Sequence, residues 1–202
     1  MIDFVATFII FFAVIDPIGT VPVFIAVTSQ YGEREKRKVA IQATAISATI
    51  LLFFVVAGEL ILTAIDIPLS AFEIAGGMVL FLFALSMIFG ESKPEQEVKL
   101  ATSGNDTAVF PLSVPSIAGP GAMLAAVMQT ENARFTLLEQ AQVASTMVAV
   151  LLVAMVLMLG ASFVHRIIGD GGASVISRVM GLILASVAVA SVLSGIKQYF
   201  LL

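Results

Sequence analysis

Apolar stretches of about twenty residues follow one another along almost the whole chain, with hardly a charge inside them. A helix rises 1.5 Å per residue, so roughly twenty apolar residues cross about 30 Å of hydrocarbon. Lipid offers backbone groups no hydrogen-bond partner, and these continuous runs lack the alternation of barrel strands. The sequence therefore predicts an all-α membrane protein with six spans, at Phe4–Ser29, Val39–Ile65, Ser70–Phe89, Val109–Thr130, Leu138–Val164 and Ile176–Phe200.

Composition fits this class and excludes several others. Only 12% of the 202 residues are charged, against about 25% in soluble domains. There is no cysteine and one histidine, His165, which excludes disulfide frameworks and Cys/His zinc sites. The motifs GxxxxGKS/T, GxSxG and HExxH are absent, so we expect no enzyme, no P-loop ATPase, and neither a metal nor an organic cofactor. The run Glu33–Lys38 is half neutralised by its own acids, so we expect no nucleic-acid partner.

Lysine and arginine are distributed unequally between the two sides of the predicted membrane. The segments after spans one, three and five, together with Arg178 at the adjoining edge of span six, carry eight of the ten, and the opposite side carries only Arg134 and Lys197. Cytoplasmic segments of membrane proteins are enriched in these residues, so we predict both chain termini outside and the three charged segments inside. The eight residues are Arg34, Lys36, Arg37, Lys38, Lys93, Lys99, Arg166 and Arg178.

Proline and glycine cluster near the middle of the first and the fourth span, in IDPIGTVP and VPSIAGPGA. Proline removes a backbone donor and glycine adds freedom, so both spans are predicted to be broken. Each half has three spans, so the second half must enter the membrane from the opposite side. We predict one transmembrane domain, residues 1–202, built from two inverted three-helix repeats (about 1–90 and 109–202) and a cytoplasmic linker at 91–108.

A broken helix inside lipid leaves amides and carbonyls that need polar partners. Amides at the restart of a half-helix would attract a carboxylate, and loose carbonyls an ammonium or a cation. The alternative is a pair of plain kinks without function. The hydroxyls at the breaks could equally bond to carbonyls of their own helix. The predicted substrate site consists of Asp16, Pro17, Gly19, Thr20, Pro22, Ser116, Gly119, Pro120 and Gly121.

Asp16 is the one acid that the sequence places deep inside a span, roughly 18 Å along the first helix from Phe4. Carboxylates at such depth usually face a cavity or a partner, so Asp16 is the candidate for coupling to H⁺ or Na⁺. Its alternative role is structural, because Asp is a favoured N-cap and Asp16 precedes a new helical start.

Other polar residues and glycines have simpler interpretations. Glu59, Asp66 and Glu73 fall near the outer ends of spans two and three, where solvated acids are expected. Gly76, Gly77 and Gly181 are typical of close contacts between membrane helices. The joining segments YGEREKRK and HRIIGDGGAS are expected to be loops.

Four segments resemble the MarC-like family of membrane proteins: IDPIGTVPVFIAVT, FEIAGGMVLFLFAL, FPLSVPSIAGPGA and RVMGLILASVAV. They are distributed over essentially the whole chain, and the two Pro/Gly signatures make the likeness specific. The resemblance implies a six-span protein of the prokaryotic inner membrane. It also implies transport of small neutral amino acids, which is known for few members.

From the breaks and the resemblance we expect a secondary transporter of glycine, alanine or serine, with the substrate held at the midplane between the first and fourth helices. The alternatives are a channel, an exporter of another small solute, or a membrane partner protein that transports nothing. The expected partners are a small-molecule substrate and membrane lipid, and an oligomer is possible.

Overall fold

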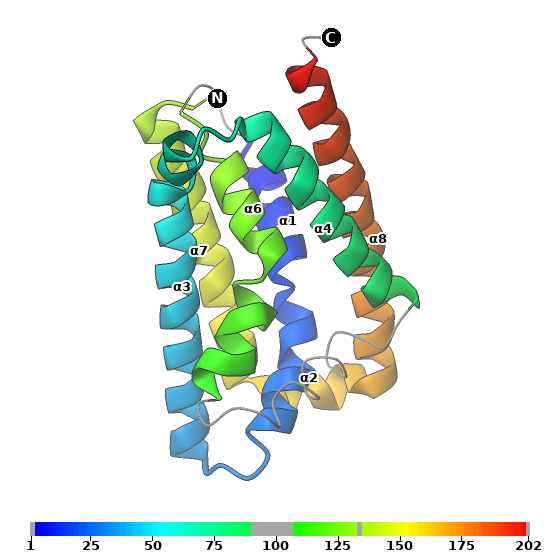
Figure 1. The fold of residues 1–202 in the computed structure, drawn as a ribbon. Coiled ribbons are helices and arrows are strands. Elements are labelled where there is room, and N and C mark those ends of the chain that lie inside the picture. Colours follow the sequence, from blue (N-terminus) through cyan, green and yellow to red (C-terminus); the bar gives the residue numbers. More distant parts are fainter. Residues whose placement is uncertain (1–2, 90–106, 133–134, 201–202) are drawn as a thin grey trace.

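The structure is a computed structural model of the chain, and it describes residues 3–89, 107–132 and 135–200. Within these ranges every regular element is a helix (Figure 1). The elements are α1 (Phe4–Ile15), α2 (Pro17–Val27), α3 (Glu33–Ala64), α4 (Leu69–Phe89), the π-helical segment η1 (Ala108–Ile117), α6 (Pro120–Met128), α7 (Leu137–Leu159) and α8 (Ala161–Tyr199).

Five stretches of the described chain are long and apolar enough to cross a membrane. They are α1 together with α2, then α3, α4, α7, and Ser174–Tyr199 of α8. The pair η1 and α6, which is bent by 56°, counts as a sixth if it is one span. The protein is therefore an all-helical, multi-pass membrane protein, as the apolar stretches predict.

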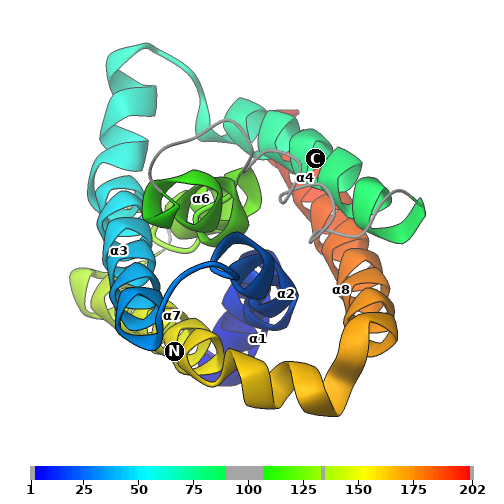
Figure 2. The same ribbon diagram turned by 90° about the horizontal axis from the view of Figure 1, so that it is seen from below.

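The first helix begins and the last helix ends at the same end of the molecule, which we call the terminal end (Figure 1). Viewed along the bundle, α1, α2 and α6 lie inside a ring of α3, α4, α7 and α8 (Figure 2). Burial agrees with this arrangement: 61% of the first span is buried inside the protein, against 22% for α3 and for Ser174–Tyr199. The inner helices are thus shielded from lipid, and the outer ones face it.

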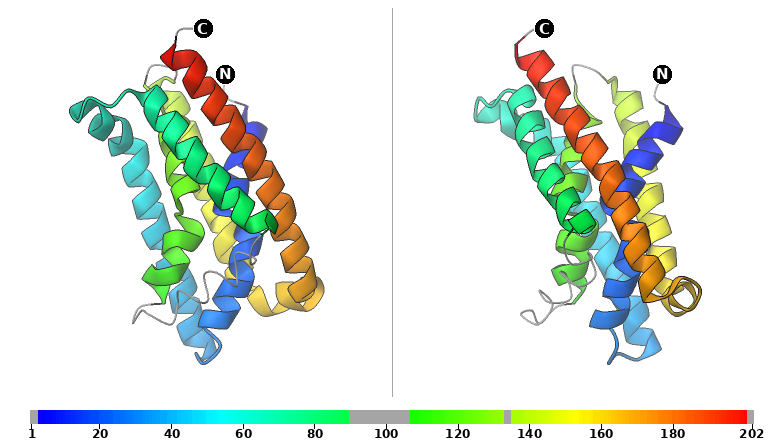
Figure 3. Two further views of the ribbon diagram at one scale, coloured as in Figure 1. Left: turned by 45° about the vertical axis from the view of Figure 1, so that its right-hand side comes forward. Right: turned by 90° about the vertical axis from the view of Figure 1, so that its right-hand side faces the viewer.

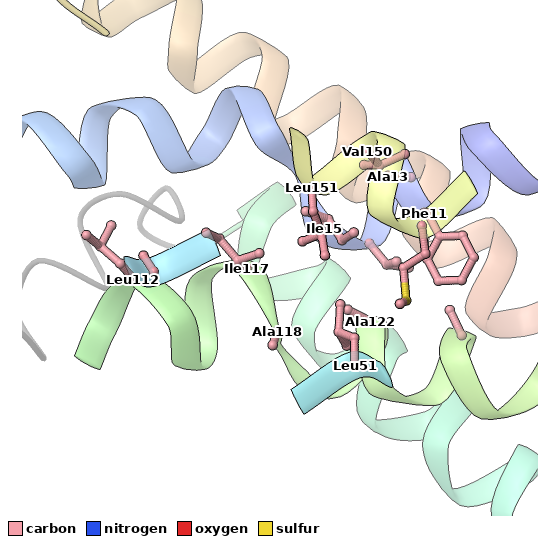
Figure 4. Packing of buried hydrophobic residues seen from close by; sticks show 14 of the residues in the cluster. Phe11, Ala13, Ile15, Leu51, Leu112, Ile117, Ala118, Ala122, Val150 and Leu151 are labelled. Carbon is pink, nitrogen blue, oxygen red and sulfur yellow. The ribbon is translucent and has the colours of Figure 1, made fainter. Parts of the chain in front are cut away.

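The core lies where the inner helices meet their neighbours. Fully buried side chains come from α1 (Phe11 and Ile15), α3 (Leu51), η1 (Ile117) and α7 (Leu151), as Figure 4 shows. These residues surround the places where α1 gives way to α2 and η1 to α6. The Pro/Gly segments therefore occupy the centre of the protein.

Close backbone packing joins α4 to α8, which lie side by side in both views of Figure 3. A Cβ added to Gly77 would lie 3.0 Å from the Ala188 carbonyl oxygen, and one added to Gly181 would lie 3.1 Å from that of Ala84. The expectation of close helix contacts at Gly77 and Gly181 is confirmed. Gly76 instead faces Leu124 of α6, whose Cδ1 would lie 2.5 Å from an added Cβ.

Two segments that were predicted to be loops are helical. Glu33, Arg34 and the charges that follow belong to the first turns of α3, where the Glu35 carboxylate accepts a hydrogen bond from the Gly32 amide at 3.2 Å. The predicted loop at 165–174 lies within α8, which leaves helical geometry at Gly169. The polar residues of both segments concealed their helical character in the sequence, because solvent-facing helix turns are as hydrophilic as loops. The linker at 91–108 lies almost entirely outside the described residues.

Candidate functional site

The chain leaves the helical conformation at Asp16, between α1 and α2. Asp16 has φ 50° and ψ 65°, the left-handed region that Asp tolerates better than most residues. Its amide still bonds to the Phe12 carbonyl at 3.0 Å, while its Oδ1 accepts from the Gly19 amide at 3.0 Å. Pro17 follows at the first helical position, where a missing N–H costs nothing. One residue thus ends α1 and caps α2, and only 1% of its surface is exposed.

Gly19 allows the Asp16 carboxylate to fold back over the start of α2. A Cβ added at Gly19 would overlap Asp16 Oδ2 and would lie 2.9 Å from Oδ1. Such distances are far inside van der Waals contact. The capping interaction and a side chain at position 19 are therefore mutually exclusive.

The second interruption lies between η1 and α6. Phe110 and Val114 leave helical geometry because each precedes a proline, which disfavours the α region for the residue before it. Gly119 then precedes α6 in an extended conformation and Pro120 takes its first position. A Cβ on Gly119 would lie 2.7 Å from the Pro115 carbonyl oxygen, so this turn requires glycine.

The two restarts match in their local design but differ in one respect. Gly119 and Pro120 take the places of Asp16 and Pro17, so Gly119 corresponds to Asp16 and not to Gly19. The start of α2 has a carboxylate cap, whereas the N-cap residue of α6, Gly119, makes no side-chain cap hydrogen bond. The first amides of α6 are therefore able to bind an anion from outside the chain.

Hydroxyl groups join the two interruptions. Thr20 Oγ1 lies 3.2 Å from Ser116 Oγ and donates to the Asp16 carbonyl at 3.1 Å. Either hydroxyl can be the donor between the two. Thr20 and Ser116 are 0% and 1% exposed. The structure thus brings Asp16, Thr20 and Ser116 into one buried polar cluster.

Two serines that were not among the predicted site residues extend this cluster toward α3. Ser113 Oγ lies 2.5 Å from the Ala108 carbonyl oxygen of its own segment and 3.1 Å from the Ala43 carbonyl oxygen of α3, and its one hydrogen can be donated to either. Ser47 Oγ donates to the Ser113 carbonyl at 3.5 Å. Both side chains are fully buried. The sequence signal that could have identified these two serines is a hydroxyl in the middle of an apolar span. Such residues usually bond within their own helix, so the signal is weak.

Some of the predicted site residues lie apart from the cluster. Pro22 is a half-buried residue inside α2, and Pro120 is exposed. Gly121 faces α4, where Leu80 Cδ1 would lie 2.6 Å from an added Cβ. Gly121 also lines a cleft of about 190 Å³ between α1, α4, α6 and α8, together with Glu73 and Gln129.

Glu73 corrects the expectation of a solvated acid. Only 3% of its surface is exposed, and its Oε2 has no hydrogen-bond partner among the described residues. Its position near the start of α4 is as the sequence indicates, but α6 and α8 cover this part of α4. Neighbouring helices, rather than depth in the membrane, bury the carboxylate.

Comparison with known proteins decides the family. Residues 1–200 match the family described as MarC family integral membrane protein. The chain belongs to the MarC family. The sequence resemblance to this family is thereby confirmed over the whole chain.

MarC family relatives from distant organisms are similar over nearly their full length. A UPF0056 membrane protein of Aquifex aeolicus is 31% identical over 199 residues, which are 96% of this chain and 92% of that protein. The UPF0056 membrane protein YvbG of Bacillus subtilis is 35% identical over 201 residues, 97% of this chain and 95% of that protein. No solved structure matches the chain. These names state membrane location and no substrate.

Proposed function

We propose that this protein is a secondary transporter of small neutral amino acids, of the glycine, alanine and serine class, in a prokaryotic cytoplasmic membrane. The observation that carries the proposal is the meeting of two helix restarts in the buried centre, linked by the Thr20–Ser116 hydrogen bond. Discontinuous helices that meet between two repeats are the usual place for substrate in such transporters.

The charge pattern of the restarts suits a zwitterion. The uncapped amides at Gly121 and Ala122 form a positive pole for the substrate carboxylate, the position that Asp16 fills with its own carboxylate at α2. The buried Asp16 carboxylate and nearby carbonyls supply negative character for an ammonium group.

Packing between helices supports two inverted repeats. In the first half α3 packs on η1 and α6 of the second half, and α7 of the second half packs on α1 and α2 of the first. Likewise α4 packs on α6 while α8 packs on α2. A two-fold relation between the halves requires that each half packs on the other through corresponding helices in this way. Rocking of one repeat against the other would then alternate access to the centre.

Uptake by proteoliposomes tests the proposal. Purified protein should carry labelled glycine with saturation, and unlabelled alanine and serine should compete. Flux that rises linearly with concentration would indicate a channel instead. Absence of flux for every small amino acid, in a preparation that is folded by circular dichroism, would reject the substrate class and favour a partner role without transport.

Coupling to H⁺ or Na⁺ is the second part of the proposal, with Asp16 as the coupling residue. Asp16→Asn keeps the size and the capping ability of the side chain but removes its charge. We expect exchange of internal for external glycine to continue while accumulation driven by a H⁺ or Na⁺ gradient is lost. Accumulation by Asp16→Asn at the wild-type level, at every pH and Na⁺ concentration, would make Asp16 a purely structural residue.

A further inference from the structure

The cleft between α1, α4, α6 and α8 holds a carboxylate that the proposed site does not use. It has a volume of about 190 Å³ and lies along α6 from Gly121, at the restart, to Gln129 near the terminal end. Glu73 of α4 lines it, buried and with Oε2 unpartnered among the described residues. A buried carboxylate without a counter-charge is unfavourable, so this group calls for a cation.

The other groups that line the cleft decide which cation fits. Gln129 and Ser191 are the polar side chains beside Glu73, and among the lining residues that the structure describes none is basic. Leu80, Leu124 and Val187 make the rest of the wall apolar. A carboxylate, an amide oxygen and a hydroxyl are three acceptors, which match the three N–H donors of a primary ammonium group.

A metal ion is a poorer match to the same walls. Hard cations take about six oxygen ligands. Within the described residues no three His, Cys, Asp or Glu side chains come together to hold a metal. A short alkyl chain on an ammonium group would instead contact the apolar wall, which a bare ion leaves uncovered.

Glu73 is too far from the α6 restart to share one small substrate with it. Leu80 packs on Gly121, and Glu73 lies seven residues earlier on α4, roughly 10 Å along the helix axis. An α-amino acid carries its ammonium and carboxylate groups on the same carbon, so it cannot reach both places. The part of the cleft at Glu73 is therefore a binding place separate from the restart, nearer the terminal end.

We propose that this cleft is an entrance site that binds the primary ammonium group of small amines and amino acids, with Glu73 as its counter-charge. Binding of an amine here stands by itself, whereas the role as an entrance rests on the proposed transport of amino acids. The two parts are separable, because an amine without a carboxylate needs only the cleft.

Calorimetric titration of the purified full-length protein with ethylammonium chloride tests the site. We expect saturable binding to the wild type, at least tenfold weaker binding to Glu73→Gln, and a few-fold loss in Ser191→Ala. Asp66→Asn is the matched control, since it removes an exposed acid next to α4 and should bind as the wild type does. Absence of binding to the wild type, or equal binding to Glu73→Gln, would overturn the assignment.

Competition and transport complete the test. NaCl at the same concentration should not displace ethylammonium, and displacement would make this an inorganic cation site, contrary to the proposal.

If the wild type carries glycine, Glu73→Gln should raise KM several-fold with little change in kcat, and an unchanged KM would reject the entrance role. If Glu73→Gln does not fold, the loss in Ser191→Ala against Asp66→Asn decides the amine site.

Discussion

Asp16 alone performs two functions that separate residues usually perform: it ends one helix and caps the next. Its left-handed backbone turns the chain out of α1, and its carboxylate satisfies the Gly19 amide at the start of α2. Both properties belong to short polar side chains, which cap helices and tolerate positive φ. Stability and proposed coupling therefore depend on different attributes of this residue: shape for the first and charge for the second.

Substitutions at Asp16 separate its two structural contributions. Asp16→Asn should unfold close to the wild type, because Asn caps helices and adopts the left-handed region. Asp16→Ala loses both, and we expect the free energy of unfolding to fall by about 2 kcal/mol. Asp16→Gly regains the backbone freedom alone and should lie between them. Thermal unfolding of the purified variants in detergent measures this order, and equal midpoints for Ala and Asn would contradict the capping geometry.

The Thr20–Ser116 pair is the other residue-scale test. Thr20→Val and Ser116→Ala should each destabilise the protein, and the double variant should show a coupling of about 1 kcal/mol. Thr44→Val serves as control, since within the described part of the chain the Thr44 hydroxyl bonds only to the Ala40 carbonyl of its own helix, at 2.9 Å. Thermal unfolding of the four variants gives the coupling. Additive effects of Thr20→Val and Ser116→Ala would mean that the two interruptions are not linked through these hydroxyls.

At the scale of elements, α8 shows how one residue directs a helix. Its first part, from Ala161, lies across the end of the bundle opposite the terminal end before the long part rises beside α4 (Figures 1 and 3). Gly169 lies between the two parts with φ 63° and ψ 174°. Only glycine adopts this conformation readily. The direction of the last span thus depends on a glycine that makes no tight contact.

Two glycines of α8 form a matched pair for testing this dependence. A Cβ added to Gly169 or to Gly171 would meet nothing within 4 Å, but only Gly169 has positive φ. We expect Gly169→Ala to destabilise the protein by about 1–3 kcal/mol through backbone strain. Gly171→Ala should be neutral or slightly stabilising, because Ala is the better helix former. Similar unfolding midpoints for the two variants would show that the break does not require glycine.

At the scale of the whole molecule, the outer helices form a ring, and the first helix begins at the end of the molecule where the last helix ends. This arrangement defines which surfaces are accessible. The unequal distribution of basic residues predicts that the terminal end faces outward. The native chain has no cysteine, so single introduced cysteines report on this directly.

Cysteine labelling in intact cells tests the orientation. Lys197→Cys, near the end of α8, should react with an impermeant maleimide added from outside. Arg34→Cys, at the start of α3, should react only after the cells are opened. Leu51→Cys is the control that should stay unlabelled, because position 51 is fully buried. The reverse pattern for Lys197→Cys and Arg34→Cys would invert the predicted topology.

Several features could be predicted from the sequence because they are local. The length of an apolar stretch alone decides whether a helix can cross a membrane, so a multi-pass helical protein followed directly. The cap at Asp16 was also foreseeable, since Asp followed by Pro is a common helix start. The contacts of Gly77 and Gly181 were expected for a similar reason: small residues mark close helix packing.

Only the tertiary structure decided which faces of these helices meet. In lipid both the buried and the exposed faces of a helix are apolar, so periodicity does not reveal which side packs inward. The Thr20–Ser116 bond joins positions 96 residues apart, and the burial of Glu73 depends on α6 and α8. The sequence by itself determined that the chain crosses the membrane several times as helices. How the helices are rotated and packed decided which polar groups the interruptions bring together, because such contacts arise between segments distant in the chain.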